Sequence, residues 1–488
     1  MAFNLSGDDV CQATIPTPIP NPYWVAFSPM AANLVGIPLG NDGLPIDQSW
    51  LAVLSGNQLN TSTHHFAKPV ATVYSGHQFG LWAGQLGDGR AILLGSLEGQ
   101  ELQLKGAGKT QYSRMGDGRA VLRSSIREFL CSEAMYGLGI PTTRALSIIG
   151  SDLPVRREMV ETAAVCARLA PSFLRIGHFE HFAATQNLVR LKELADCLIE
   201  QHYPESLNAK EPYLDLFKRV CERNAKLVAK WQAVGFCHGV LNSDNISVLG
   251  LTMDYGPFGF LDHFKIDHIC NHSDQGGRYA YHRQPQIMHW NMACLASALL
   301  PLLELNCSEM LAQEQLRDAL EEFPGIYAKE WQSLFRKKLG FSTSQQEDIE
   351  LIERLLQAMH DSKVDFTRFF RQLSAIKLDV PLEQIALRNE FIDRASIDQW
   401  FLAYIKRLQN EHSVDAERQI RMNQINPKYV LRNHLAQSAI EKAQKKDFSE
   451  VNLLLNILSR PYDEQPTHES FALAPSPDLD PVEVSCSS

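Results

Sequence analysis

The chain of 488 residues lacks features that would place it in several large classes of protein. Its 10 cysteines stand singly with no C-x-x-C spacing, so neither a zinc ribbon nor a dense disulfide framework is expected. It has no basic excess: the net charge of -10 argues against a nucleic-acid partner or an anionic membrane. The most apolar run, 292–305, is shorter than the ~20 residues of a membrane span and predicts a buried helix.

Basic residues are also missing from the N-terminal end, where Lys68 is the first. A secretory leader or an Arg-rich transit peptide needs basic residues there, so we expect a cytoplasmic protein. What is present is ordinary globular composition, 45% hydrophobic and 21% charged. The length suits about three domain-sized units.

The N-terminal third predicts strands around one helix. Residues 1–65 are rich in Pro, Asn and Gly and should form extended segments and turns over a surface. Two strands joined by a Gly-bearing turn are predicted within 90–106, and a helix over 119–136. Three further strand-like runs are expected at 143–150, 155–161 and 164–170.

From about residue 190 the pattern becomes helical. Residues 213–234 place apolar side chains at i, i+3 and i+4 and stop at Gly235, which indicates a core-facing helix. A later helix has apolar residues through 352–359, preceded by the cap-like residues 342–344. The tail from Pro461 is rich in Pro, Asp, Glu and Ser and should be extended or mobile.

The loop Cys237–Asp262, CHGVLNSDNISVLGLTMDYGPFGFLD, carries the densest set of residues suited to a nucleotide site. In kinase-like folds one Asp orients the acceptor hydroxyl, an Asn binds Mg²⁺, and a later Asp before a Gly binds the metal on the phosphates. In this chain Val240 follows His238-Gly239, where aminoglycoside kinases have the base Asp, and Asp244 is the only nearby acid. The loop therefore predicts a metal and nucleotide site without a phosphotransfer base.

Asn245 and one later Asp are the expected metal ligands, because Mg²⁺ in such sites takes few protein oxygens. Asp254 and Asp262 compete for this role. Asp254 precedes Tyr255 and Gly256, which resembles the Asp-aromatic-Gly metal motif of kinases, so we favour it. Asp262 follows an apolar strand and is expected to be a cap or turn residue.

Cationic side chains before the loop suit the same kind of site. Lys105 ends a strand on the face opposite its leucines, and Glu128 lies on the next helix, in the order of the kinase Lys-Glu pair. Arg168 and Arg175 could grip phosphate oxygens. The alternative for each cation is an ordinary solvated side chain.

Glycine-rich turns could add backbone amides. Gly84, Gly87 and Gly89 could bring amides close to phosphates or simply form tight turns. Asp117 and Gly118 either face a nucleotide or form a plain Asp-Gly turn.

The segment GAGKT at 106–110 is not expected to be a P-loop. That motif requires a Gly five positions before Gly108, where Gln103 stands. Turn-forming residues also follow where its helix should begin. We therefore exclude a P-loop ATPase.

These motifs together closely resemble the selenoprotein O family of protein adenylyltransferases, which have a pseudokinase fold. The motifs that carry the resemblance are SGHQFG, GQLGDGRA, LKGAGKTQYSR, GDGRAVLRSSIRE, CARLAPSFLR, the loop 237–262, CNHSDQGGRY and the terminal CSS. The resemblance covers most of the chain. It implies an α+β, bilobal kinase-like fold with an N-terminal wrap and N-lobe over 1–170, a C-lobe over 171–330, a helical extension over 331–460 and a tail over 461–488.

The resemblance implies that ATP binds in a flipped orientation and that AMP is transferred to Ser, Thr or Tyr hydroxyls of protein substrates, with Mg²⁺ or Mn²⁺ and with UTP as a possible second donor. It implies that Lys105 pairs with Glu128 and holds phosphates, and that Arg168 and Arg175 also bind phosphates. It implies that Asp244 is the active-site acid and that Asn245 and Asp254 bind metal, with Asp254 also contacting ATP. The residues it implies as the lining of the nucleotide site are Gly87, Gly89, Arg90, Asp117 and Gly118. The chain departs from the family at 109–111, where Lys-Thr-Gln puts the turn conformation in doubt.

Two other functions stay open at this point, a kinase-type phosphotransferase and a non-catalytic nucleotide-binding scaffold. We expect the protein to be a monomer whose partners are protein substrates. Cys486 matches the selenocysteine or cysteine near the C-terminus of the family. A reversible disulfide between Cys486 and Cys270 would make the enzyme redox-regulated; the alternative is two unpaired thiols.

Overall fold

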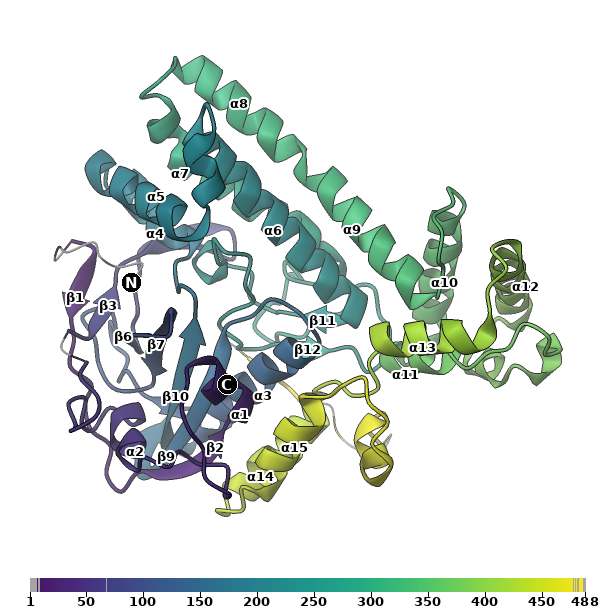
Figure 1. Cartoon of the computed structure of the whole chain (residues 1–488), viewed down its shortest axis with the longest axis horizontal. Helices are drawn as coiled ribbons and strands as arrows, with labels where there is room; N and C mark the ends of the chain where they lie inside the picture. The colour runs from purple at the N-terminus through teal and green to yellow at the C-terminus, as the bar shows by residue number, and fades with distance from the viewer. Residues whose placement is uncertain are drawn as a thin grey trace.

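The computed structural model describes residues 7, 9–66, 68–476, 478, 480 and 482–485, and its architecture mixes a large antiparallel sheet with many helices (Figure 1). The main sheet has the strand order β1-β3-β6-β7-β10-β9-β2, with β8 paired to β10. Its strands are β1 (Cys11–Ala13), β2 (Tyr23–Phe27), β3 (Val70–Thr72), β6 (Ala91–Leu97), β7 (Gln100–Lys105), β8 (Ala120–Val121), β9 (Arg144–Arg156) and β10 (Val160–Ala170). Two small hydrogen-bonded pairs are β4 (Ser75–Gln78) with β5 (Leu81–Gln85), and β11 (Phe236–Cys237) with β12 (Gly259–Phe260).

The helices become dominant after the sheet. Those of the first two thirds are α1 (Pro29–Leu34), α2 (Ser49–Leu54), α3 (Leu122–Gly137), α4 (Ile176–Ala184), α5 (Leu188–His202), α6 (Pro212–Val234), α7 (Gln284–Leu303), α8 (Glu309–Glu321) and α9 (Phe323–Lys338). The later ones are α10 (Asp348–Ser362), α11 (Phe366–Leu373), α12 (Arg394–Asn410), α13 (Asp415–Ile425), α14 (Asn433–Ala443) and α15 (Ser449–Leu458). Short 3₁₀ turns are η1 (Pro204–Asn208), η2 (Ser243–Asn245), η3 (Tyr281–Arg283), η4 (Leu382–Gln384), η5 (Ala386–Glu390) and η6 (Pro466–Ala472).

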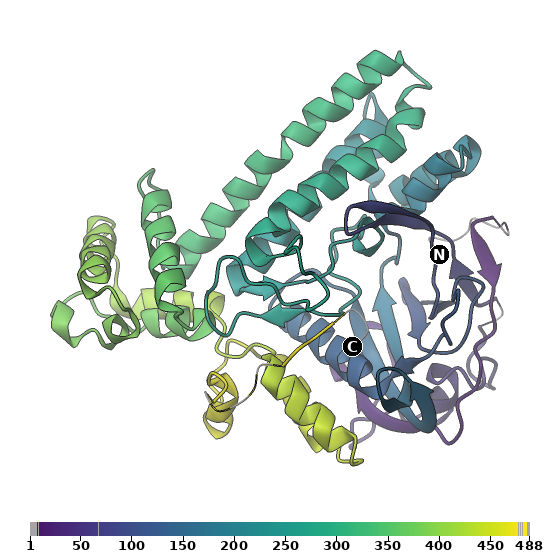
Figure 2. The ribbon, with the colours of Figure 1, turned by 180° about the vertical axis from the view of Figure 1, so that it is seen from behind.

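Some helices pack on the sheet, and others lie far from it. Helix α6 packs against both α7 and α9, and α8 and α9 form a long diagonal arm that ends at α10–α13, far from the sheet (Figures 1 and 2). Residues of α1 and α2 share one apolar core with one face of the sheet. Helix α3 covers the other face, and α14 and α15 pack behind it.

Side-chain alternation along β10 determines which groups reach the site. Successive side chains of a strand point to opposite faces. Val165, Ala167 and Leu169 join the core shared with α1 and α2. Arg168 therefore projects from the other face, where it lies in register with Gln103 of β7 and donates a hydrogen bond to it.

Strand β7 follows the same rule, as the sequence predicts. Leu102 and Leu104 face the core, and Lys105 points away from it. Glu101 and Gln103 are also buried, because both faces of this sheet are covered. The strands predicted within 90–106 are confirmed as β6 and β7.

Several predicted helices are confirmed. The helix expected over 119–136 is α3, and the one over 213–234 is α6, which ends at Gly235 with φ at 69°. A left-handed residue at this position suits glycine, which has no Cβ to clash with the preceding carbonyl. The apolar residues within 352–359 are the buried stripe of α10.

Several predictions of local structure are wrong. Residues 1–65 are not only extended, because α1 and α2 form there; Ser28 caps α1 by accepting the amide hydrogen of Ala31. The run 155–161 is not a separate strand, because β9 and β10 are long and meet in a hairpin turn whose outer residues are exposed. The residues 342–344 do not cap α10.

The reason for the last error is a contact from far along the chain. The amides of Ser342 and Thr343 donate to the carboxylate of Glu411, which follows α12, and α10 begins only after Glu347. The tail also departs from prediction, because η6 forms within it and Val484 makes a parallel bridge with Asn271.

The apolar run at 292–305 belongs to a longer helix than the sequence predicts. Tyr281–Leu303 spans 23 residues and is long and apolar enough to cross a membrane by length and composition. Of its most apolar window, 56% is buried inside the protein, and α7 packs against α4, α6 and α8. These contacts confirm the expectation of a buried helix.

Candidate functional site

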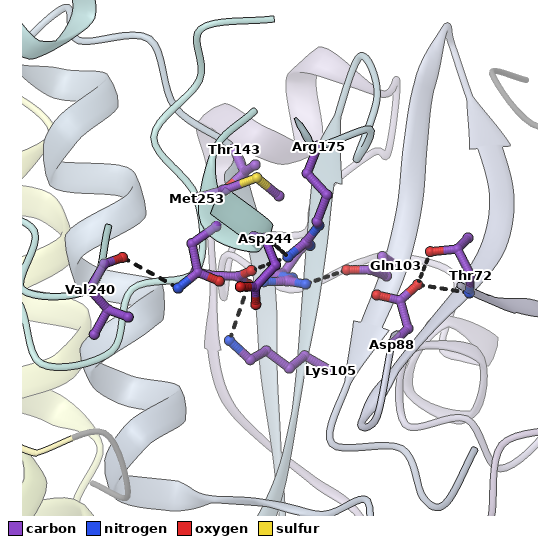
Figure 3. Close-up of polar contacts among 12 residues, drawn as sticks. Thr72, Asp88, Gln103, Lys105, Thr143, Arg175, Val240, Asp244 and Met253 are labelled. Atoms are coloured by element: carbon purple, nitrogen blue, oxygen red, sulfur yellow. Dashed lines mark hydrogen bonds and ion pairs between the residues drawn. The ribbon is translucent and has the colours of Figure 1, made fainter. Parts of the chain in front are cut away.

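A cleft of about 640 Å³ lies where the α3-facing side of the sheet meets the loop after β11. Its volume suits a nucleotide, since small-molecule sites span roughly 300–1,000 Å³. Figure 3 shows Lys105, Arg175 and Asp244 meeting there from separate elements. Gly84 does not line this cleft, but the other residues assigned to the site by the motifs and the family resemblance do: Gly87, Gly89, Arg90, Lys105, Asp117, Gly118, Arg168, Arg175, Asp244, Asn245 and Asp254.

A buried ion network forms the floor of the cleft. Lys105 Nζ lies 2.7 Å from a carboxylate oxygen of Glu128, whose other oxygen accepts from Arg168 at 2.8 Å. The carboxylate of Asp254 accepts hydrogen bonds from the guanidiniums of Arg168 at 2.7 Å and Arg175 at 2.6 Å, and Lys105 Nζ lies 3.6 Å from it. Three cations thus face two carboxylates, which suits the binding of a further anion.

Both carboxylates of this network are held in the ionised form. Burial raises the pKa of Asp254, but the guanidiniums of Arg175 and Arg168 and the ammonium of Lys105 outweigh it, so its pKa lies well below the ordinary value. Burial likewise raises the pKa of Glu128, and Lys105 and Arg168 again bring it below its usual range. The two carboxylates therefore stay charged near neutral pH, whereas burial lowers the pKa of Lys105 despite the neighbouring charges of Glu128 and Asp254.

The two candidate metal-binding aspartates lie in different surroundings. Asp254 lines the cleft with φ at 57°, in the left-handed region that Asp tolerates better than most residues. Asp262 does not line the cleft; its carboxylate pairs with Arg432 at 2.7 Å. The structure thus brings Asp254, and not Asp262, next to the predicted phosphate-binding cations.

Asp244 sits in the short turn η2, buried at the edge of the cleft. Its Oδ2 accepts from Gln78 at 3.4 Å, whereas its buried Oδ1 has no hydrogen-bond partner among the described residues. Burial raises the pKa of Asp244 to about 6, against the opposing charge of Arg175. Asn245 donates its side-chain amide to the carbonyl of Val240 at 3.3 Å. One oxygen of the Asp244 carboxylate is therefore left without a hydrogen bond, and it is shielded from solvent in this structure.

The glycine-rich turns pack tightly against one another at the mouth of the cleft. Gly87 has φ at 146°, and a Cβ there would lie 2.4 Å from the Tyr112 ring. Gly118 has φ at 70°, and a Cβ there would lie 2.1 Å from the carbonyl oxygen of Gly108. Only glycine fits both positions. The segment 106–118 is irregular and no helix follows Gly108, which agrees with the exclusion of a P-loop.

Asp88 is a residue of the cleft that sequence reasoning missed. It is buried and accepts two hydrogen bonds from Thr72, one from the amide at 3.0 Å and one from the hydroxyl at 2.6 Å (Figure 3). Its carbonyl accepts from the hydroxyl of Thr110 at 2.7 Å. Asp88 therefore fixes the turn that contains Gly87 and Gly89. The signal was its place inside the motif GQLGDGRA.

Arg157 was also missed, because its run was interpreted as a strand. It lies in the turn between β9 and β10, lines the cleft, and pairs with Asp117 at 2.8 Å. This bidentate contact holds the turn of Asp117 and Gly118 against the sheet.

Comparisons with known proteins agree with the geometry. The family described as protein adenylyltransferase SelO matches residues 42–459. The protein nucleotidyltransferase YdiU of Cupriavidus metallidurans is 53% identical over 485 residues, which cover 97% of this chain and 88% of that relative. The YdiU of Burkholderia ambifaria is 51% identical over 499 residues, covering 100% and 95%. That of Ralstonia nicotianae is 53% identical over 492 residues, covering 97% and 92%.

Such similarity along nearly the whole chain, together with a cleft suited to a polyphosphate, defines the class: the protein is an enzyme, a nucleotidyltransferase. Within that class, the chain belongs to the SelO family of protein adenylyltransferases. The resemblance inferred from the sequence motifs is therefore confirmed.

Proposed function

We propose that the chain transfers AMP from ATP to the hydroxyl of a Ser, Thr or Tyr in a protein substrate. One observation carries the proposal: the acid Asp244 lines the cleft, while apolar Val240 stands where a phosphotransferase has its base. A side chain without an ionisable group cannot accept the proton of an acceptor hydroxyl. We infer that the acid in the cleft serves a nucleotide that presents another phosphate.

We also infer a kinase-like, bilobal pseudokinase fold. The order of a strand with Lys105, a helix with Glu128 and then the loop with Asn245 and Asp254 supports this inference. The proposed parts are the N-terminal wrap and N-lobe at 1–170, the C-lobe at 171–330, the helical extension at 331–460 and the tail at 461–488.

For the nucleotide, we assign the cations of the cleft to the phosphates of ATP. Lys105, Arg168 and Arg175 are buried and already aligned by Glu128 and Asp254. Guanidinium groups suit phosphate because they donate two parallel hydrogen bonds. The remaining lining residues, assigned to the nucleotide by their position, are Gly87, Gly89, Arg90, Asp117 and Gly118.

Asn245 and Asp254 would hold a divalent cation, Mg²⁺ or Mn²⁺. The pair fits such an ion: Asp254 is ionised, and Asn245 gives its amide nitrogen to Val240, which leaves its oxygen for a metal. When bound, the metal neutralises phosphate charge.

The transfer step uses Asp244 at the acceptor. The hydroxyl oxygen of the substrate forms a bond to the α-phosphorus, the bond from that phosphorus to the bridging oxygen breaks, and pyrophosphate leaves. The Asp244 carboxylate accepts the hydroxyl proton or orients it. Lys105 and the two arginines stabilise the charge that accumulates on the pyrophosphate.

The test uses ATP labelled at either the α- or the γ-phosphate, with Mg²⁺ or Mn²⁺ and protein acceptors. Transfer of AMP predicts stable α-label on protein and none from the γ position. Label from the γ position alone would identify a kinase, and nucleotide binding without any labelled product would identify a scaffold. The same assay with UTP measures whether a second nucleotide competes.

We also propose redox control through Cys270 and Cys486. The tail reaches the Cys270 loop: His272 donates its amide to the carbonyl of Val484 at 2.9 Å. Cys486 itself lies outside the described residues. Burial raises the pKa of the Cys270 thiol, so exchange would be slow unless the loop opens. A peptide map under oxidant without a Cys270–Cys486 crosslink would reject this proposal.

The proposed setting is the cytoplasm, with protein substrates, a monomeric enzyme, and neither nucleic acid nor membrane as partner. The described cysteines form no disulfide, which suits a reducing compartment. The acidic net charge of -10 supports the exclusion of nucleic acid. Sedimentation of the purified chain measures the oligomeric state directly.

A further inference from the structure

The β4–β5 hairpin is clamped onto the turn that carries Asp244. Ser243 Oγ accepts the backbone amide hydrogen of His77 at 2.8 Å and donates to Glu180 at 2.5 Å. The other oxygen of Glu180 lies 2.7 Å from Nδ1 of the same histidine. At Gly76 a Cβ would lie 3.1 Å from the Cβ of Asp244, so the hairpin backbone rests directly on the turn. The hairpin is therefore held at a fixed position relative to the acid.

The next residues of the hairpin form the wall of the cleft beside Asp244. Gln78 donates to its carboxylate, and both Gln78 and Phe79 line the cleft. The amide of Phe79 donates to the side-chain oxygen of Asn242 at 3.1 Å and to the hydroxyl of Tyr279 at 2.9 Å. The wall is thus anchored by backbone as well as side-chain bonds.

Beyond this wall the hairpin presents apolar side chains to solvent. Phe79 is 39% exposed, Leu81 76% and Trp82 46%. Trp82 packs edge-on against His77, with ring centroids 5.1 Å apart, and is therefore held in place. Three large apolar side chains within four residues, next to a reactive group, are typical of a protein-binding surface.

A cation lies at the turn of the same hairpin. A Cβ at Gly80 would lie 2.9 Å from the guanidinium carbon of Arg278, and the guanidinium stacks over Trp290 at 4.7 Å. In the described part of the chain Arg278 forms no ion pair, and both its Nε and its Nη2 are buried without a hydrogen-bond partner. Asp274, the nearest acid in sequence, is occupied by the backbone amides of Arg278 and Tyr279. We name Phe79, Leu81, Trp82 and Arg278 the hairpin platform.

We propose that the hairpin platform binds the acceptor protein, through a segment that has apolar side chains and a carboxylate near the reacting hydroxyl. The inference rests on the proposed transfer to protein hydroxyls. A cleft of about 640 Å³ holds a nucleotide but no folded protein, so the acceptor lies outside it and reaches Asp244 across the wall. The exposed apolar groups match apolar side chains, and the Arg278 guanidinium matches a carboxylate by charge.

The test uses two sets of synthetic peptides, each with one Ser, Thr or Tyr, and ATP labelled at the α-phosphate. The first set has Leu, Phe and Glu around the hydroxyl residue; the second has Ser, Thr and Gln at those positions. The enzymes are the wild type, Leu81→Asp, Trp82→Ala and Arg278→Met. Ile420→Asp is the matched control, because Ile420 is 62% exposed on α13, which belongs to the distal helices.

We expect the wild type to label the first set at least about tenfold faster, which corresponds to ~1.4 kcal/mol. Leu81→Asp and Trp82→Ala should reduce kcat/KM for the first set by about tenfold without changing the KM for ATP. Arg278→Met should reduce the preference for the first set without abolishing it. Ile420→Asp should behave as the wild type.

Two results would overturn the inference alone: equal labelling of both sets by the wild type, or equal losses in Leu81→Asp and Ile420→Asp. An absence of α-label from every peptide, with α-label still appearing on the protein acceptors of the assay above, would also overturn this inference alone. An absence of α-label from both peptides and proteins would overturn the proposed transfer as well, so the two failures are distinguishable.

Discussion

The ion pair between Lys105 and Glu128 makes a quantitative prediction about the cleft. The two charges lie 2.7 Å apart, and their side chains are only 12% and 5% exposed. At an effective dielectric constant of about 20, Coulomb attraction at that separation is about 6 kcal/mol, and the cost of desolvating both groups cancels most of it. We expect a net coupling of about 1–3 kcal/mol between the two residues.

The perturbations are Lys105→Met, Glu128→Gln and the double substitution. Each single change leaves a buried charge with a poorer set of partners: Glu128 keeps Arg168 at 2.8 Å, and Lys105 keeps only Asp254 at 3.6 Å. We expect each single change to lower the free energy of unfolding by about 3 kcal/mol, the lower end of the range for broken buried pairs. The double change should lower it by less than the sum.

The assay is urea denaturation of the four proteins, with AMP transfer measured in parallel. The exposed pair Lys192 and Asp196 is the matched control, because its separation is 2.6 Å but its side chains are 49% and 39% exposed. That pair should couple by less than about 0.5 kcal/mol. Equal coupling energies for the buried and the exposed pair would refute the reasoning, and so would full AMP transfer by Lys105→Met.

Three further predictions concern single residues. Asp244→Asn should reduce AMP transfer by about 10²–10⁴ and leave ATP affinity nearly unchanged, as measured by kinetics and calorimetry. Asp262→Asn should keep most of the activity, whereas Asp254→Asn should lose it, because only Asp254 lines the cleft. Burial lowers the pKa of Lys338 to about 7 in the folded protein. Between pH 7 and the ordinary pKa of lysine, the unfolded chain therefore binds one more proton than the folded protein. The free energy of unfolding should rise with pH in this range, by up to about 1.4 kcal/mol per pH unit. Lys338→Met should abolish this slope, and the exposed control Lys337→Met should keep it.

Each of these has a clear contrary result. A marked loss of ATP affinity in Asp244→Asn would make that acid a nucleotide ligand. Equal activities of Asp254→Asn and Asp262→Asn would contradict the preference for Asp254 over Asp262 as the metal ligand. Identical pH dependence in the wild type and Lys338→Met would mean that water or a backbone group solvates the amine, which lies 4.2 Å from the Phe370 ring centroid.

Local patterns in the sequence were enough for much of the fold, and together with the family resemblance they predicted many of the residues that line the cleft. The spacing within 213–234 specified α6, and the alternation at 101–105 put Lys105 on the face toward Glu128. The kinase-like order of Lys105, Glu128 and the loop 237–262 predicted that these residues share one site. In the structure Lys105, Glu128 and residues of that loop line the same cleft.

What the sequence could not give depends on contacts between distant segments. Glu180 and Ser243 lie 63 residues apart, and neither belongs to a short motif that would connect them. Glu411 replaces the expected caps at 342–344 because it reaches back across 68 residues to Thr343. The position of Arg157 could not be predicted from the run 155–161 alone, because it depends on where the long strands β9 and β10 end and begin.

Asp254 has a consequence that reaches beyond its choice as metal ligand. Its carboxylate accepts from Arg168 and Arg175, the same guanidiniums proposed to hold phosphate. A polyphosphate that enters the cleft therefore exchanges one anionic partner for another and does not have to draw in loose, mutually repelling side chains. In this sense Asp254 is an internal counter-anion, which keeps the two guanidiniums in place while no phosphate is bound. The affinity of the proposed phosphate site then depends on the difference between the arginine–phosphate and the arginine–Asp254 interactions.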